Sequence, residues 1–412
     1  MPRTALCLAL VLLSACTAAG SSVEPVTLRV AMADDWASAP AVTEVITQFE
    51  ADHEHVRVEV TDSPFSQIAD LVGASQELGQ AYDLAHWHAF AAASAGLAQP
   101  LGELWEDHDL RADDYLDGAL QSVTWRGERY GVPLDTNALV LLVRPETLEE
   151  AGVGVDELAH VDDFLGVARR MVEQEVAPHA MLIGASSWTA YGWIRAFGGE
   201  LVTVDEATGE PEFSFDDPST VAALELRAAL VGEGLTPSPF APDLASEGVQ
   251  LFASGQVAMH AGGSWDLPMM ARADVDVDDV EVLPLPRGDG DTGTVLGGSS
   301  LFVPYGAAEP ELAFELALRL TSDEVALRLA EEEGRLPARS RVFDDELFQR
   351  SDDLEAFVAQ LPEADVMPLI AYPQIADAFR EALENTLAGR QEVGEAMAEV
   401  QRYAEEWAET RE

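Results

Sequence analysis

Residues 28–87 read LRVAMADDWASAPAVTEVITQFEADHEHVRVEVTDSPFSQIADLVGASQELGQAYDLAHW, and this stretch decides the fold class. Apolar or alternating segments at 28–33, 56–60 and 82–87 predict strands, whereas 41–51 and 66–78 place apolar side chains at helical spacing. The resulting order of strand, helix, strand, helix, strand favours a parallel sheet with helices on both faces. The sequence therefore predicts an α/β protein.

Polar and aromatic side chains follow each of these strands. Ligands of parallel sheets bind where the strands end, at their carboxyl edge. The residues at the three strand ends are therefore candidate ligand contacts, namely Asp34, Asp35, Trp36, Phe65, Trp87 and His88. The two aspartates could equally form an exposed acidic turn.

The pattern restarts after residue 131. An extended segment at 132–137 ends in Asn137, a strand is predicted at 139–143, and helices are predicted at 161–175 and 218–231. A further strand at 257–261 runs into Gly262-Gly263-Ser264-Trp265, and another short strand is predicted at 301–303. A chain of 412 residues exceeds what one core normally organises, so we expect at least two lobes. Because no long linker separates them, several short extended crossings should join the lobes.

The amino-terminal segment has the pattern of a lipoprotein signal peptide. Arg3 precedes an apolar run at 5–13, and Leu13-Ser14-Ala15-Cys16 matches the bacterial lipobox. We expect cleavage after residue 15, lipidation of Cys16 and a tether over 16–25. The alternative is an ordinary secretory signal in which Cys16 is incidental. No later apolar stretch is long enough to cross a bilayer, so the mature protein is expected outside the cytoplasm, anchored to the cell membrane.

The acidic amino-acid composition limits the classes of partner that the protein is expected to bind. The chain holds 75 acidic and 23 basic residues, a formal net charge of −52, which disfavours nucleic acid and anionic lipid. The acidic residues are scattered and 48% of the residues are hydrophobic, which indicates a folded protein with an acidic coat. A high-salt habitat would screen that charge, although a generally acidic proteome would explain it equally.

Metal and cofactor chemistry is not expected. The cysteines are Cys7 and Cys16, so the mature fold holds no disulfide. His86 and His88 have a spacing that zinc accepts, but further ligands are not evident. The glycine pairs at 262–263 and 297–298 lack the lysine of a phosphate loop. We therefore predict no cofactor, no metal and no catalytic residue.

Several short motifs appear together in a fixed order behind the lipobox. They are YDLAHW at 82–87, YGVP at 130–133, FGG at 197–199, FASGQVAM at 252–259, GSW at 263–265, GG at 297–298, GRLPAR at 334–339 and AGRQ at 388–391. In this order the chain resembles the extracellular solute-binding proteins of ABC importers, in the branch that includes maltose-binding protein. The resemblance implies two α/β lobes, a ligand cleft between them and a hinge of several crossings. It divides the chain into one lobe of 26–136 and 285–320 and another of 137–284 and 321–412.

The resemblance also implies roles for individual residues. Trp87, Trp188 and Trp265 correspond to aromatic side chains that face the sugar, and Asn137 to a polar group at the hinge. The further candidates are Tyr191, Gly263, Ser299 and Tyr372. A pyranose has apolar C–H faces that aromatic rings cover and a rim of hydroxyls that Asp and Asn bind. Any one tryptophan could instead be a packing residue.

Two positions depart from a maltodextrin site. Ala89, Phe90 and Ala91 stand where maltose-binding protein carries a carboxylate, and Asn137 stands at its hinge carboxylate. The expected function is a monomeric substrate-binding lipoprotein that captures a sugar or oligosaccharide and delivers it to the permease subunits of an ABC importer. Two alternatives stay open. One is a receptor for a polyamine or other small solute, and the other is an exported carbohydrate-active enzyme using a carboxylate pair.

Overall fold

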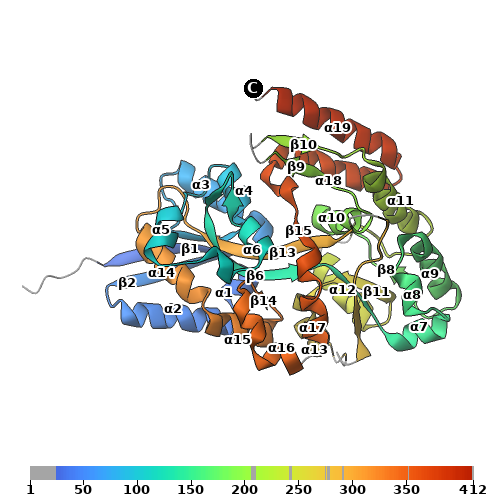
Figure 1. Ribbon diagram of the computed structural model, residues 1–412, viewed down its shortest axis with the longest axis horizontal. Helices are drawn as coiled ribbons and strands as arrows, with labels where there is room; N and C mark the ends of the chain where they lie inside the picture. The colour runs from blue at the N-terminus through green and yellow to red at the C-terminus, as the bar shows by residue number, and fades with distance from the viewer. Residues whose placement is uncertain are drawn as a thin grey trace, which may run out of the picture.

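The structure is a computed structural model that describes residues 25–205, 210–240, 244–273, 275, 279–289, 292–350 and 352–410. Its two lobes lie side by side in Figure 1, with strands running between them. The predicted signal peptide and Cys16 lie outside the described residues. No described helix is long and apolar enough to cross a membrane.

The first lobe is built on a seven-stranded sheet of order β14-β6-β13-β3-β1-β2, with β15 paired to β13. Strand β1 (Val26–Ala33) pairs in parallel with β2 (Val56–Ser63) and with β3 (Leu84–Trp87). Helices α2 (Pro40–Asp52) and α3 (Ile68–Glu77) make the two connections. The predicted order of three strands and two helices is thereby confirmed, and the three strand ends meet at one edge.

One long strand holds the first sheet together. Strand β13 (Thr294–Phe302) pairs antiparallel with β3 on one side and with β6 (Gly131–Ala138) on the other. Two short strands extend the sheet, β14 (Leu336–Pro337) beside β6 and β15 (Ala364–Val366) parallel to β13.

The second lobe has its own four-stranded sheet of order β12-β7-β11-β8. Strand β11 (Val257–Gly262) runs parallel to β8 (His179–Met181) and antiparallel to β7 (Val140–Val143). Strand β12 (Glu281–Leu283) pairs with the other edge of β7. Because β8 and β11 are parallel, their carboxyl ends lie at the same edge of the sheet.

The other helices and hairpin strands cover these sheets. They are α1 (Asp34–Ala37), α4 (Ala89–Ser94), α5 (Gly102–Asp107), α6 (Asp117–Gln121), α7 (Pro145–Ala151), α8 (Val155–Leu158), α9 (Val161–Glu173), α10 (Ser187–Ala196), α11 (Pro218–Gly232), α12 (Leu244–Ala253), α13 (Leu267–Arg272), α14 (Pro310–Leu320), α15 (Asp323–Glu333), α16 (Glu346–Arg350), α17 (Asp352–Val358), α18 (Pro373–Leu387), α19 (Val393–Glu409), β4 (Thr124–Trp125), β5 (Glu128–Arg129), β9 (Val202–Val204) and β10 (Pro211–Phe213).

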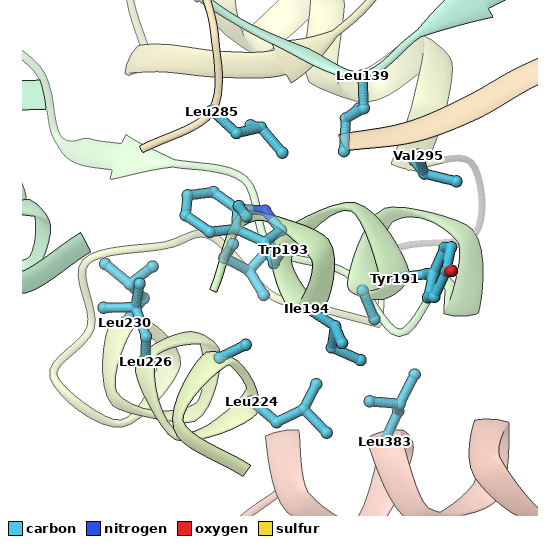
Figure 2. Close-up of a cluster of buried hydrophobic side chains, with 14 of the residues drawn as sticks. Leu139, Tyr191, Trp193, Ile194, Leu224, Leu226, Leu230, Leu285, Val295 and Leu383 are labelled. Atoms are coloured by element: carbon cyan, nitrogen blue, oxygen red, sulfur yellow. The ribbon is translucent and has the colours of Figure 1, made fainter. Parts of the chain in front are cut away.

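The second lobe is centred on helix α10, every residue of which from Ala190 to Ala196 is buried. Figure 2 shows Trp193 and Ile194 of this helix among leucines of α11 and Leu383 of α18. Burial on all sides is typical of a helix inside a core rather than at a surface. Helix α10 is therefore a rigid support for the residues at its amino end.

The lobes are joined by extended segments, as the sequence predicts. The chain passes from β6 to β7 through Leu139, whose backbone N–H donates to the carbonyl of Val295 at 3.2 Å. Thr294 Oγ1 donates to the Leu139 carbonyl at 2.6 Å, so the two crossings are bonded to each other.

Helix α15 follows the predicted lobe boundary at residue 320. It contacts α2, and its Val325 and Leu329 belong to the same buried cluster as Phe49 of the first lobe. Helices α18 and α19 pack instead against α11 of the second lobe. The lobe boundaries given above stay a prediction.

Candidate ligand-binding cleft

A pocket of about 200 Å³ lies at the carboxyl ends of β8 and β11. Open α/β sheets place their ligands at this edge because the loops that follow the strands diverge there. Eight residues with polar or aromatic side chains line the pocket, namely Ser186, Trp188, Thr189, Trp193, Arg227, His260, Trp265 and Asp266.

Two half-buried tryptophans form one wall of this pocket. The ring centroids of Trp188 and Trp265 are 5.7 Å apart with an angle of 64° between the planes. The Trp188 indole N–H donates to the backbone carbonyl of Leu296 at 3.3 Å, which ties the ring to β13. The pair therefore presents apolar ring faces at fixed positions.

Glycines make room for this wall. A Cβ at Gly263 would lie 1.9 Å from the Trp265 ring, so the indole folds back over a backbone that carries no side chain. A Cβ at Gly262 would lie 2.0 Å from Asp266 Oδ2. Gly263, a predicted site residue, thus seats Trp265.

A buried histidine and aspartate lie beside the tryptophans. His260 Nε2 and Asp266 Oδ2 are 3.0 Å apart, and the Gly263 N–H donates to the same oxygen at 3.1 Å. His260 is 6% exposed and Asp266 2%. The sequence analysis missed both residues, although a histidine inside a buried strand is an unusual signal.

Arg227 of α11 also lines the pocket, and it is not among the residues predicted from the sequence. The residue is 1% exposed, and its Nη2 donates to the carbonyl of Gly184. Its Nε has no hydrogen-bond partner among the residues that the structure describes. Burial lowers the pKa of the Arg227 guanidinium to about 10, so the group stays charged at neutral pH.

The hinge strands add polar groups next to this wall. A Cβ at Gly297 would lie 1.9 Å from Asn137 Oδ1 and 2.9 Å from the Trp188 ring, so both side chains meet over this glycine. Asn137 Oδ1 is buried and has no partner in the described part of the chain. A buried amide oxygen without a partner is rare in folded proteins, which keeps Asn137 as a candidate ligand contact.

Ser299 belongs to the same strand but is already engaged. Its N–H donates to Asp135 Oδ1 at 2.8 Å, and its hydroxyl bonds to the same oxygen. Burial raises the pKa of the Asp135 carboxyl, against the lowering effect of Arg335 and of the Ser299 bonds. Ser299 therefore holds the Asp135 carboxyl group in place.

The aromatic candidates of the first lobe gather into a second wall, in which Trp36, at 4% exposed, is a packing residue. Trp36 and Phe65 pack on the buried His86 ring, with centroids 5.1 and 5.3 Å away, and Phe65 also contacts His88 at 5.1 Å. Trp87 is half-buried beside them, and its carbonyl accepts a hydrogen bond from Ser300 of β13 at 2.8 Å.

Strand β13 connects the two walls. Ser300, beside Trp87, and Gly297, beneath Trp188, are three residues apart, which corresponds to about 10 Å along a strand. A second contact lies at Gly334, where a Cβ would come within 2.2 Å of the Ser264 carbonyl. Strand β13 therefore places Trp87 of the first lobe and Trp188 of the second near each other at the junction of the lobes.

The acidic candidates of the first lobe have local partners. Asp35 forms an ion pair with Arg335, whose guanidinium lies 5.1 Å from the centre of the Trp36 ring. Asp34 is exposed, and its Oδ1 accepts the Asp35 N–H at 2.9 Å.

Two predicted tyrosines are not brought to the cleft. Tyr191 has no exposed surface, and its hydroxyl bonds to Glu200 inside the second-lobe core. Tyr372 is 4% exposed and packs among Trp125, Phe213 and Trp407. Both tyrosines are packing residues in this structure.

The two histidines of the first-lobe wall, His86 and His88, lead to a pH prediction. Burial lowers the pKa of His86 to about 3, helped by Arg335 and His88, and burial lowers the pKa of His88 to about 4. In the unfolded chain both titrate near 6.5. Below that pH the unfolded state binds protons that the folded state does not, so stability is full above pH 6.5 and falls as the pH decreases.

The loss should reach about 1.4 kcal/mol per pH unit for the fully buried His86, with a smaller share from the partly exposed His88. Urea unfolding of the protein and of a His86→Gln, His88→Gln variant between pH 6.5 and 5 measures it. The variant should show the shallower slope, and equal slopes would refute the assignment.

No group of three His, Cys, Asp or Glu side chains able to hold a metal occurs among the described residues. The His86–His88 spacing thus gains no third ligand there, and the histidines serve as ring partners for aromatic side chains.

Two α/β lobes joined by several extended segments, with a tryptophan-lined pocket at strand ends, are typical of solute-binding proteins. The chain belongs to the bacterial extracellular solute-binding protein family, whose profile matches residues 44–356. An ABC transporter extracellular-binding protein of Pyrococcus horikoshii is 24% identical over 353 residues, which cover 83% of this chain and 79% of that protein.

Solved structures agree on the fold. The GacH receptor of Streptomyces glaucescens, described unliganded and with acarbose, superposes with a TM-score of 0.80 at 23% identity and covers 93% of this chain and 99% of its own. UgpB from Mycobacterium tuberculosis, in complex with glycerophosphocholine, gives 0.79 at 20% identity, with 94% and 99% covered. The predicted two-lobed periplasmic-binding-protein-like fold is confirmed.

Proposed function

We propose that this protein captures a sugar in the interlobe cleft outside the cell and delivers it unchanged to the permease of an ABC importer. The observation that carries the proposal is the pair Trp188 and Trp265, which lines one pocket together with the buried polar groups of Arg227, His260 and Asp266. Aromatic faces cover the C–H faces of a pyranose, and this chemistry suits sugars better than most polar solutes.

Acceptors for sugar hydroxyls lie next to these rings. Asn137 Oδ1 has no partner among the residues that the structure describes, and the Asp266 carboxylate lines the same pocket as Trp265. Sugar hydroxyls donate to such oxygens. The proposal also draws on the GacH receptor, a protein of similar fold that was solved with acarbose.

The residues that line the pocket and the related proteins favour a sugar receptor over a polyamine receptor and over an exported enzyme. A polyamine would bring positive charge to a pocket lined by the buried Arg227 guanidinium, which opposes cation binding. The proteins of similar fold named above are binding proteins, so we propose capture without chemical conversion.

Titration calorimetry against neutral mono- and oligosaccharides, sugar phosphates, glycerophosphocholine and spermidine tests the proposal. We expect binding of at least one sugar, with the ligand recovered intact by mass spectrometry after incubation. Conversion of the ligand would favour an enzyme. Binding of spermidine or glycerophosphocholine with no response to any sugar would contradict the proposal.

We further propose that Cys16 carries the lipid that anchors the mature protein. Intact-mass analysis of the membrane fraction should show an amino terminus at Cys16 with a diacylglyceryl adduct. A Cys16→Ser variant should lose the adduct and leave the membrane fraction. A mature wild-type protein that begins elsewhere and stays soluble would refute the anchor.

A further inference from the structure

We infer that the pocket behind Trp188 and Trp265 binds a negatively charged substituent of the ligand, a carboxylate or a phosphate, with Arg227 as its partner. The inference deepens the proposed function and rests on it. Its ligand would be an acidic sugar, such as a uronate or a sugar phosphate.

The first argument is the charge balance around Arg227. A buried charge is costly unless another charge or several hydrogen bonds compensate it. In the described part of the chain Arg227 forms no ion pair, and a backbone carbonyl, that of Gly184, accepts its Nη2. The chain holds 75 acidic residues, so a carboxylate partner would have been easy to supply. An unpaired guanidinium under these conditions suggests that the partner comes from outside.

The second argument is the position of Arg227, which lines the pocket and has a hydrogen-bond donor that no described residue uses. That donor is its buried Nε. A guanidinium that lines a pocket and keeps one N–H without a partner suits the oxygens of a carboxylate or phosphate. The neighbouring Gly184 carbonyl holds the other arm of the group in place.

A third element of the pocket adds positive potential. Ser186, the cap of the ten-residue helix α10, and Trp188 and Thr189 of its first turn line the same pocket. No acidic residue occupies that first turn. Helix amino termini attract anions through their free N–H groups and the helix dipole. The helix end and Arg227 therefore favour the same charge.

The acidic member of the pocket is compatible with this arrangement. Asp266 Oδ2 already receives the Gly263 N–H at 3.1 Å and lies 3.0 Å from His260 Nε2. Its contacts leave it as an acceptor for hydroxyl groups on the rest of the ring. The pocket thus combines one anion partner with one hydroxyl partner, which matches an acidic sugar.

Matched ligand pairs test the inference by calorimetry. The probes are D-glucose, D-glucuronate and D-glucose 6-phosphate, together with D-galactose and D-galacturonate. A charge-assisted hydrogen bond should make the acidic member bind about 10- to 100-fold tighter than its neutral counterpart. Neutral sugars that bind as well as their acidic counterparts, or better, would overturn the inference and leave the proposed function standing.

The variant Arg227→Met tests whether Arg227 binds the ligand or only stabilises the fold. The matched control is Arg169→Met, which removes an exposed ion pair of the same lobe. Arg227→Met should abolish the preference for acidic sugars and leave the apo melting temperature equal or higher, because it removes an unpaired buried charge. The control should keep the preference. A lower apo melting temperature with the preference intact would show that Arg227 serves the fold, and would overturn the inference.

A measurement on the unmodified protein covers the case in which Arg227→Met fails to fold. Inorganic phosphate should raise the apo melting temperature above that in chloride at equal ionic strength, and an Arg227→Lys variant should respond less. No shift in the wild type would overturn the anion site. A shift without binding of any sugar would support the anion site and refute the sugar function.

Discussion

Trp265→Ala is expected to weaken sugar binding by about 2–4 kcal/mol, roughly 30- to 1,000-fold, while the unliganded protein stays folded. The side chain is half-buried at the mouth of the pocket, edge-on to Trp188. Removing it exposes the ligand's C–H face to water and leaves Trp188 without its neighbour. Calorimetry with the sugar found for the wild type measures the change.

The matched control is Trp105→Ala in the first-lobe core. Trp105 is 5% exposed, and its indole N–H donates to the Gly131 carbonyl at 3.1 Å. Truncating a buried tryptophan costs about 3–5 kcal/mol of stability, but the affinity of the Trp105→Ala variant for sugar should change little. If Trp265→Ala showed this second pattern, with a large loss of apo stability and unchanged affinity, Trp265 would be a packing residue.

The first half of the fold could be predicted because its signals are local. Between residues 28 and 87, alternating and apolar runs separate cleanly from helical spacing, and each element forms where the pattern places it. The first-lobe aromatic residues Trp36, Phe65 and Trp87 were found for the same reason, whereas Trp188 came from the family resemblance. The three first-lobe residues follow strands, and the carboxyl ends of parallel strands converge in space.

Strand β13 shows where local signals fail. The sequence predicted a strand only at 301–303, whereas the structure extends it from Thr294 to Phe302. Gly297, Gly298 and two serines have low strand propensity, which is overridden by pairing with β6 along most of the strand and with β15 and β3 at its two ends. Packing of α15 on the first lobe is likewise a tertiary contact that no local pattern encodes.

The buried polar groups of the pocket escaped prediction for a related reason. Arg227 lies on α11, where apolar residues occur on all sides of the helix, so spacing does not reveal which face meets the pocket. His260 and Asp266 meet only because η3 (Ser264–Asp266) turns back over two glycines. Trp188 and Tyr191 of α10 were both candidates. Trp188 lines the pocket, whereas Tyr191 is buried in the core.

Gly298→Ala is expected to destabilise the protein by about 2–6 kcal/mol, because two costs coincide. Its φ is +112°, a conformation that residues with a side chain rarely adopt. A Cβ there would also lie 2.3 Å from the Asp135 carbonyl and 2.9 Å from Thr136 Cα. The pairing of β13 with β6 is irregular one residue further on, between Ser299 and Ser300, and this glycine allows the close approach.

Gly79→Ala is the matched control for backbone strain alone. Gly79 has a φ of +66°, and no atom lies within 4 Å of the position that its Cβ would take. Its substitution should cost about 1–2 kcal/mol, the price of the left-handed conformation. Urea unfolding of both variants gives the difference, which isolates the contact with β6. Gly298 lies between Gly297, over which Asn137 and Trp188 meet, and Ser299, which bonds to Asp135. A much larger loss of stability in Gly298→Ala than in Gly79→Ala would therefore mean that the pairing of β13 with β6 positions the ligand wall. Equal losses in the two variants would mean that β13 can shift away from β6 without cost.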